Sequence, residues 1–307
     1  MRILVVGGSG LIGAHVVDVL RERGHAATTV ARTAHPGIDH LLDLQAASVD
    51  DLRPLLAGHD GVVYATRSEE QRPLPKPIHP VFRRDMVEPV VRLFDAARQE
   101  GLTRGVIMGS YYTYFERLHP QWRLADRHTY VRCRVEQARE GRAAAGPDLP
   151  VAVLELPFVF GRAGDRLPNW AGPLDRWARS RTPLVVPGGG SAGASARSVA
   201  EIAVDALERA SGDDIPVADE NLTWEDMISR IAEAVGRRRR VRRLPPGAVR
   251  AALRLGGALQ SLGGKESGVN PSHAADLFLT ELFVEPTTGR SVDPALRETF
   301  ADPAPPA

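Results

Sequence analysis

Short apolar runs alternate along the first half of the chain with segments in which apolar residues recur at helical spacing. The runs predict strands over residues 3–6, 27–31, 41–44, 60–66, 105–110 and 151–156, and the segments between them predict helices over 11–20, 49–56, 81–100 and 129–145. Strands that alternate with helices are typical of a doubly wound parallel sheet, so we expect an α/β fold of the Rossmann type.

The pattern of the second half is less regular and mainly helical. Beyond 157–161 it predicts a Trp-containing segment over 168–183, an apolar run over 184–186, a glycine-rich loop over 187–193, a helix over 198–210, a strand over 215–218 and a helix over 222–235. We therefore expect a dinucleotide-binding domain over 1–156, to which 195–218 return, and a small, mostly helical C-terminal substrate lobe over 157–194 and 219–300. The prolines of 67–80 and the aromatic segment 111–122 predict loops, and 301–307 predict a disordered tail.

Glycines stand at positions 7, 8, 10 and 13, between the first strand and the first helix. In this context Gly7 permits a tight turn, Gly10 lets the backbone approach a pyrophosphate, and Gly13 lets the helix pack close to the strand. The free N–H groups and the dipole of the helix N-terminus favour an anion there. We expect a dinucleotide on this loop, held by Gly7, Ser9, Gly10, Leu11, Ile12 and Gly13; an ordinary glycine-rich turn is the alternative.

The end of the second strand carries Arg32, 19 positions after Gly13 and close to the roughly 20 at which an NAD-specific site places an acid. A guanidinium can fork onto a 2′-phosphate, so Arg32 favours NADP over NAD; a surface arginine that ends a strand is the alternative. Further along, Asp43 and Leu44 follow the third strand at the adenine side, and Ala65 and Thr66 end the fourth strand where the cofactor should lie.

Composition and charge narrow the classes of partner. The formal net charge of +1 predicts no nucleic-acid or membrane partner, and the arginine-rich run 236–243 is interpreted as a solvated face, with nucleic-acid binding as the alternative. One cysteine excludes an intramolecular disulfide, and the absence of a long apolar segment or signal peptide predicts a cytoplasmic protein. The nine histidines show no metal-ligand spacing, so no metal is expected. A homodimer is compatible with the chain.

The order of these motifs resembles the extended short-chain dehydrogenase/reductase family, the NAD(P)-dependent epimerase/dehydratase group. The resemblance rests on the glycine loop, VVYAT after the fourth strand, Ser110 after the fifth, Tyr130 at the start of a helix and LPFVFG after the sixth. It spans residues 1–235 and implies Ser110 and Tyr130 as catalytic residues, with Pro157 and Phe158 beside the cofactor. The family's lysine, four residues after the tyrosine, is Arg134 here, and the arginine of its sixth-strand motif is Glu155, which weakens a nucleotide-sugar assignment.

The substitution at Arg134 changes what the resemblance implies. A free tyrosine titrates near pH 10, and a cation at about 4 Å contributes about 4 kcal/mol of Coulomb energy at an effective dielectric near 20. Arg134 can therefore stabilise a Tyr130 phenolate and hydrogen-bond a ribose, but it cannot release a proton. The resemblance then implies an NADP(H)-dependent oxidoreductase or epimerase that transfers hydride between nicotinamide and a carbonyl or alcohol carbon of a small-molecule substrate. The alternative is a cofactor-binding sensor or scaffold without turnover.

Several other side chains near these motifs invite more than one interpretation. His128 either carries a proton in place of Tyr130 or is a solvated residue at a helix start, and Arg132 is expected to pair with Glu136 one turn on. A set of aromatic residues either lines a substrate pocket or packs the lobe against the sheet; these are Tyr111, Tyr112, Tyr114, Phe115, Trp122, Trp170 and Trp177.

Overall fold

The structure is a computed structural model that describes residues 1–66 and 73–301. Residues 67–72 of the predicted loop and 302–307 of the predicted tail lie outside the described residues. Among those that are described, no helix is long and apolar enough to span a membrane.

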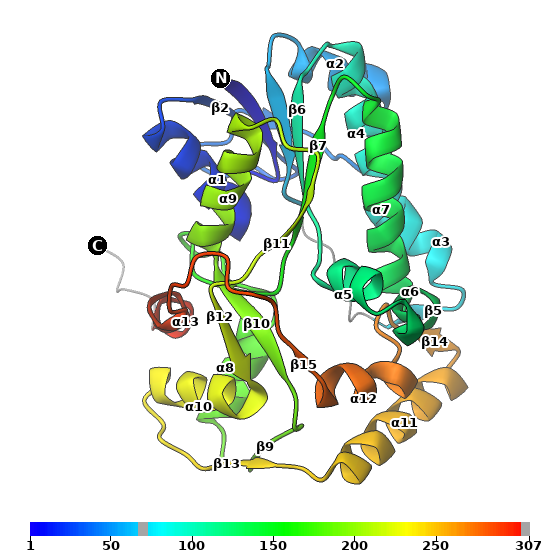
Figure 1. Ribbon diagram of the computed structural model, residues 1–307, viewed down its shortest axis with the longest axis vertical. Helices are drawn as coiled ribbons and strands as arrows, with labels where there is room; N and C mark the ends of the chain where they lie inside the picture. The colour runs from blue at the N-terminus through cyan, green and yellow to red at the C-terminus, as the bar shows by residue number, and fades with distance from the viewer. Residues whose placement is uncertain (67–72, 302–307) are drawn as a thin grey trace.

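Seven parallel strands form the main sheet, in the order β11-β7-β6-β4-β1-β2-β3. They are β1 (Arg2–Val6), β2 (Ala26–Ala31), β3 (His40–Leu41), β4 (Gly61–Tyr64), β6 (Arg104–Met108), β7 (Val151–Glu155) and β11 (Asp214–Pro216). Helices α1 (Leu11–Glu22) and α9 (Ala196–Glu208) cover one face, whereas α2 (Val49–Leu56), α4 (Glu88–Gln99) and α7 (Thr129–Ala145) cover the other (Figure 1). The doubly wound Rossmann-type fold is confirmed.

The continuous apolar run of β1 follows from burial on both faces of the sheet. Ile3 and Val5 pack with α1 and α9, and Leu4 and Val6 pack with α2 and α4. All four side chains are at most 3% exposed. A strand that is covered on both sides cannot alternate apolar with polar residues, which is why the run has no polar member.

The remaining elements form a second lobe below the sheet (Figure 1). A four-stranded sheet of β8 (Phe158–Phe160), β10 (Gly190–Ser195), β12 (Glu220–Thr223) and β15 (Glu281–Leu282) packs with α8 (Ala171–Arg179), α10 (Trp224–Ala234) and α13 (Asp293–Phe300). Two small ribbons pair β9 (Leu184–Val186) with β13 (Val241–Arg243), and β14 (Lys265–Glu266) with β5 (Leu74–Pro75). Helices α11 (Pro246–Leu262) and α12 (Pro271–Leu279) complete the lobe.

Three local predictions were wrong. The glycine-rich segment 187–193 contains the start of strand β10, because Gly190 and Gly193 leave room for the carbonyl oxygen of Leu222 and the ring of Phe160. The aromatic segment 111–122 forms helix α5 (Tyr112–Leu118) and a 3₁₀ turn (Pro120–Trp122), followed by α6 (Leu124–Arg127), since its rings pack into the core. The third strand covers His40–Leu41 rather than 41–44.

The predicted helix over 81–100 is one helical segment with an irregularity. It begins as α3 (His79–Phe82), continues through a π-helical turn (Arg83–Val87) and ends as α4. A π-turn adds a residue to the helical repeat and redirects the side chains around it. Two residues of this turn, Asp85 and Met86, line the cavity described below.

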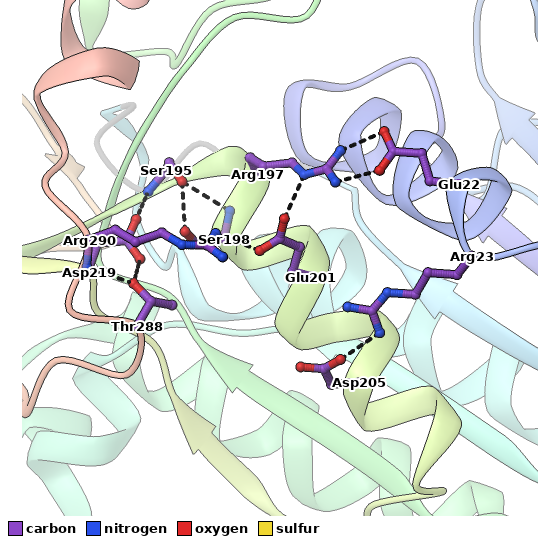
Figure 2. A network of polar contacts seen from close by, with 10 residues as sticks. All are labelled: Glu22, Arg23, Ser195, Arg197, Ser198, Glu201, Asp205, Asp219, Thr288 and Arg290. Carbon is purple, nitrogen blue, oxygen red and sulfur yellow. Dashed lines mark hydrogen bonds and ion pairs between the residues drawn. The ribbon is translucent and has the colours of Figure 1, made fainter.

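Helix α9 is fixed by polar contacts at its outer surface (Figure 2). Arg197 pairs with Glu22 of α1 and with Glu201 of its own helix, each at 2.8 Å, and Arg290 pairs with Glu201 at 2.6 Å. At the start of the helix, buried Asp219 accepts a hydrogen bond from the backbone N–H of Ser195 at 2.7 Å. Exposed ion pairs contribute about 0–1 kcal/mol each, so the apolar contact of α9 with α1 carries most of the stability and the charges fix the orientation.

Candidate functional site

A cavity of about 740 Å³ opens at the carboxyl ends of the central strands. Its wall includes the last residues of β1, β2, β4 and β6, the first turn of α1, and the loop over 156–170. Thirteen of the sixteen residues predicted for the site line it: Gly7, Ser9, Gly10, Leu11, Ile12, Arg32, Asp43, Leu44, Ala65, Thr66, Tyr130, Arg134 and Pro157. Gly13, Ser110 and Phe158 do not line it.

The glycine loop has the geometry of a dinucleotide cradle. Gly7 has φ +91°, and a Cβ there would lie 2.7 Å from the carbonyl oxygen of Ala65. A Cβ on Gly13 would lie 2.1 Å from the carbonyl oxygen of Gly7, so Gly13 acts by letting α1 pack against the turn. No side chain caps α1, and its first turn has no acidic residue, which leaves the N-terminal N–H groups and the dipole directed at the cavity. These features fit the pyrophosphate of a nicotinamide cofactor.

The far end of the cavity is basic. Arg32 lies there with His35 and Arg166, and the Arg166 Nη2 atom contacts the His35 Nε2 atom at 2.5 Å. The sequence reasoning missed His35 and Arg166. His35 is three residues beyond Arg32 and could have been suspected, whereas Arg166 comes from the loop after β8 and gives no local signal.

Tyr130 and Arg134 lie together in the cavity wall. Arg134 Nε donates a hydrogen bond to the Tyr130 hydroxyl at 3.1 Å, and the guanidinium carbon is 5.2 Å from the centre of the ring. The same side chain donates from Nη1 to the carbonyl oxygen of Met108 at 3.1 Å and to Gln137 Oε1 at 2.7 Å. Gln137 in turn donates to the carbonyl oxygen of Met86 at 2.7 Å. The positive charge is therefore buried and held beside the phenol oxygen, directly by the end of β6 and, through Gln137, by the π-helical turn.

Comparison with known proteins gives the same class of fold. A family model described as NAD(P)H-binding matches residues 7–145. No curated protein sequence matches the chain. Among solved structures, that of gox2253 is similar with a TM-score of 0.77 and 19% sequence identity. The alignment covers 97% of this chain and 96% of the gox2253 chain.

Two further solved structures carry a cofactor in their descriptions. The human epimerase family protein SDR39U1 (isoform 2) with NADPH has a TM-score of 0.66 at 18% identity, over 98% of this chain and 99% of that one. MoeE5 in complex with UDP-glucuronic acid and NAD has a TM-score of 0.61 at 20% sequence identity. The alignment covers 80% of this chain and 85% of the MoeE5 chain. This chain has an NAD(P)-binding domain and the fold of the extended short-chain dehydrogenase/reductases.

Ser110 does not lie in the cavity wall, although the sequence predicted it as a catalytic residue. Its side chain is 4% exposed and lies outside the cavity lining. The Ser110 hydroxyl is a distant acceptor, at 3.5 Å, for the backbone N–H of Tyr112, and the Ser110 carbonyl accepts from the Thr113 hydroxyl at 2.7 Å. The side chain predicted to polarise a substrate is thus buried next to Gly109, which does line the cavity.

Glu155, at the position of the family's arginine, has an internal structural role. The side chain is fully buried and accepts two hydrogen bonds at 2.9 Å from Arg117 and one at 2.7 Å from the Thr113 hydroxyl. A buried carboxylate is stable only when its charge is paired in this way. Phe158 is also turned away from the cavity, because its ring packs against Trp170 and Trp224 in the lobe.

His128 is neither solvated nor available as a proton carrier. Its side chain is 1% exposed, and burial lowers the pKa of His128 to about 4. Nδ1 accepts a hydrogen bond from the backbone N–H of Asn270 at 3.1 Å. The neutral ring therefore joins the start of α7 to the C-terminal lobe.

The aromatic residues named from the sequence divide between the two interpretations. Trp170 is in the cavity wall, whereas Tyr111 donates to or accepts from Ser191 at 2.9 Å and is buried, which raises the pKa of Tyr111 to about 12. The rings of Tyr112, Tyr114, Phe115 and Trp122 pack in the core beneath α5 and α6.

One cluster resembles a metal site in composition. The ligand atoms of His79, Cys133 and Glu136 lie within 4.8 Å of one another. Glu136 already pairs with Arg83 at 3.0 Å and, as predicted, with Arg132 at 2.9 Å. Burial raises the pKa of the Cys133 thiol to about 12, so the thiolate that a metal needs is disfavoured. The cluster is better described as an ion-pair network that joins α3 and the π-helical turn to α7.

Proposed function

We propose that this protein is an NADP(H)-dependent oxidoreductase or epimerase-type enzyme that acts on a carbonyl or alcohol carbon of a small molecule. The observation that carries the proposal is the 3.1 Å hydrogen bond from Arg134 Nε to the Tyr130 hydroxyl, in the wall of a cavity that also holds the glycine loop. A fixed cation at this distance stabilises the phenolate and so lets tyrosine exchange a proton near neutral pH.

Each residue then has a definite task. The bound cofactor supplies or accepts hydride. The N–H groups of the turn before α1 hold its phosphates, and the charge of the Arg134 guanidinium stabilises the Tyr130 phenolate. Tyr130 donates its hydroxyl proton to a substrate carbonyl oxygen during reduction and takes a proton from an alcohol in the reverse direction.

Arg32 supports a preference for NADP. It lines the basic end of the cavity with His35 and Arg166, and a 2′-phosphate there would accept charge-assisted hydrogen bonds that a ribose hydroxyl replaces poorly. We propose NADP(H) as the physiological cofactor on this ground.

Several apolar side chains line the cavity beside the carboxylate of Asp85. Among them are Leu74, Phe82, Met86, Leu167 and Trp170. Such a lining favours a small apolar carbonyl compound over a nucleotide sugar, whose diphosphate needs cations, and the internal role of Glu155 agrees with this.

The test combines cofactor binding with turnover. NADPH is titrated against Trp fluorescence, which the cavity residue Trp170 reports, and its oxidation is followed with a panel of aldehydes, ketones, imines and nucleotide sugars. Tyr130→Phe should retain NADPH binding and lose turnover, whereas Tyr114→Phe, in a tyrosine outside the cavity wall, should retain both. The proposal is overturned if the protein binds neither NADPH nor NADH.

A cofactor-binding sensor is a second candidate, favoured by the position of Ser110 outside the cavity lining. It predicts tight NADPH binding without oxidation of any compound in the panel. Turnover that appears only when Arg134→Lys restores the family's lysine would support the sensor, because the natural chain would then hold the cofactor without the group that completes the reaction.

A further inference from the structure

The charges of the chain are distributed very unevenly. Residues 236–265 contain nine of the 39 Lys and Arg residues and none of the 38 Asp and Glu residues. This segment therefore has a formal charge of +9, and the remainder, with 30 basic and 38 acidic residues, has −8. The net charge of +1, from which we expected no membrane partner, conceals this separation.

The same segment contains an exposed apolar stripe. Three of the six exposed large apolar side chains in the described chain lie on α11: Leu255 at 63%, Leu259 at 61% and Leu262 at 85%. Their spacing places them on one face of the helix. On the opposite side, Val249 and Gly257 are buried, and Gly257 packs closely on Ser272 at the start of α12.

The basic residues surround this stripe only in part, because Arg254 lies beside it on α11 whereas Arg250 lies on the side of Gly257. Arg250 and Arg254 lie on α11 itself, and the run 237–243 leads into it through β13; both elements lie at the end of the molecule remote from the N-terminal sheet (Figure 1). Within residues 1–66 and 73–301, ion pairs hold Arg238 to Glu233 and Arg243 to Glu225, and Arg239 donates to backbone carbonyls. No ion pair in those ranges involves the other basic residues of the segment: Arg237, Arg240, Arg242, Arg250, Arg254 and Lys265.

We propose that this end of the protein, defined by α11 and the arginines of 237–243 and named here the α11 face, binds the surface of an anionic lipid bilayer. An apolar stripe that enters the interface, with cations beside it that meet the headgroups, is the arrangement of an interfacial helix. Charge complementarity selects this occupant. A second copy that docked through the same face would bring one +9 segment against another, and a nucleic acid would use the arginines but leave the leucines in water.

The α11 face also adjoins the site. Strand β14, directly after α11, pairs with β5, and Leu74 of β5 lines the cavity. Shortly beyond β14, the carbonyl oxygen of Gly268 accepts a hydrogen bond from the backbone N–H of Tyr130 at 2.9 Å. Docking of the α11 face would therefore hold the catalytic helix near the lipid surface, where apolar substrates concentrate.

Sedimentation with vesicles tests the proposal without any need for turnover. The full chain is mixed with vesicles of phosphatidylcholine alone, or of phosphatidylcholine with phosphatidylglycerol, at low and high salt. Binding should require phosphatidylglycerol and weaken as salt rises. The variant Arg254→Gln should weaken binding about fivefold. The triple variant Leu255→Ser, Leu259→Ser and Leu262→Ser should weaken it at least about tenfold.

The control is Leu118→Ser, which removes a leucine that is 53% exposed on α5 and should leave vesicle binding unchanged. All variants should keep the melting temperature and NADPH affinity of the parent, which shows that they are folded. The proposal is overturned if the protein binds neutral vesicles as well as anionic ones, or binds neither. It is also overturned if light scattering shows a dimer that the leucine variant dissociates and no vesicle binding is seen. Binding to duplex DNA that the arginine variant abolishes and the leucine variant does not would likewise overturn it.

Discussion

The two walls of the cavity are built by different means. The cofactor wall is a continuous piece of chain, from β1 through the glycine loop into α1, and its shape comes from backbone geometry. The other wall carries Tyr130, the proposed catalytic residue, and is named here the catalytic wall. It brings together the end of β6, the start of α7, the π-helical turn and, behind α7, the C-terminal lobe. The shape of the cofactor wall therefore depends on glycines, which lack a Cβ. The shape of the catalytic wall depends on hydrogen bonds between groups that are far apart in the sequence.

The difference explains where the family pattern is kept and where it is altered. A glycine at φ +91° has no substitute, so the loop keeps its residues. A cation beside Tyr130 can be supplied by more than one side chain, provided that the surroundings satisfy its other donors. Arg134 has more donors than a lysine, and Met108 and Gln137 accept them.

The largest effect should follow from removal of the cation in the catalytic wall. Arg134→Met removes about 4 kcal/mol of Coulomb stabilisation from the phenolate, so we expect kcat to fall roughly a thousandfold at neutral pH, measured by NADPH oxidation. It also leaves Met108 and Gln137 without a donor, which should cost about 1–3 kcal/mol in the free energy of unfolding. Arg134→Lys keeps the charge and should recover most of kcat. An Arg134→Met enzyme with the parent's kcat would show that the pair has no part in the reaction.

In the cofactor wall, the largest effect should come from a single methyl group. Gly13→Ala places a Cβ 2.1 Å from the carbonyl oxygen of Gly7. Because the backbone of α1 fixes the Cβ and the oxygen belongs to the backbone of the turn, α1 must move. We expect a loss of about 3 kcal/mol in the free energy of unfolding, measured by urea denaturation, and weaker NADPH binding. Gly172→Ala on α8 is the matched control, because its nearest neighbour is the far end of the flexible Arg176 side chain. Equal stability of the two variants would contradict close packing as the role of Gly13.

The sequence predicted the cofactor wall well because its signals are local. Gly7, Gly10 and Arg32 lie within one strand-turn-helix-strand unit, and each has a chemical reason to be where it is. In the catalytic wall, the i, i+4 spacing revealed Tyr130 and Arg134, but Gln137 gave no signal because its partner, the Met86 carbonyl, comes from a π-helical turn. Burial of His128 depends on residues near 270, far along the chain.

The lobe shows the same limit in its fold. Strand β10 consists of small residues and has no apolar alternation, since close neighbours such as the Leu222 carbonyl take the space of its side chains. Nothing in a glycine-rich segment distinguishes such a strand from a loop until its partners are known. Arg166, at the basic end of the cavity, is likewise invisible from the sequence because its position depends on how the lobe meets the sheet.

A smaller effect should separate the two cofactors at the basic end. Arg32→Ser removes a charge-assisted contact with a 2′-phosphate, so we expect NADPH affinity to fall about thirty- to hundredfold, a loss of about 2–3 kcal/mol. NADH has no phosphate at this position and serves as the internal control, with an affinity that should stay within about threefold. Fluorescence titration of both cofactors measures the ratio. An equal loss for both would mean that Arg32 supports the fold of the loop and not cofactor choice.

The smallest effect concerns how the catalytic wall responds to pH. Burial, reinforced by the nearby charges of His273 and Arg127 and opposed by Asp276, lowers the pKa of His128 from 6.5 to about 4. Between these values the unfolded chain binds a proton that the folded chain does not, so stability falls as pH falls through this window. This loss in the free energy of unfolding amounts to about 2 kcal/mol between pH 7.5 and 5.

The variant His128→Asn tests this effect, because it keeps an acceptor for the Asn270 N–H without a titrating group. Its free energy of unfolding, measured by urea denaturation at both pH values, should fall about 2 kcal/mol less than that of the parent. The variant His119→Asn, at a half-buried histidine that stacks on Trp122, should follow the parent. If His128→Asn also follows the parent, the acid sensitivity arises elsewhere, and the link between α7 and the C-terminal lobe does not depend on a neutral His128.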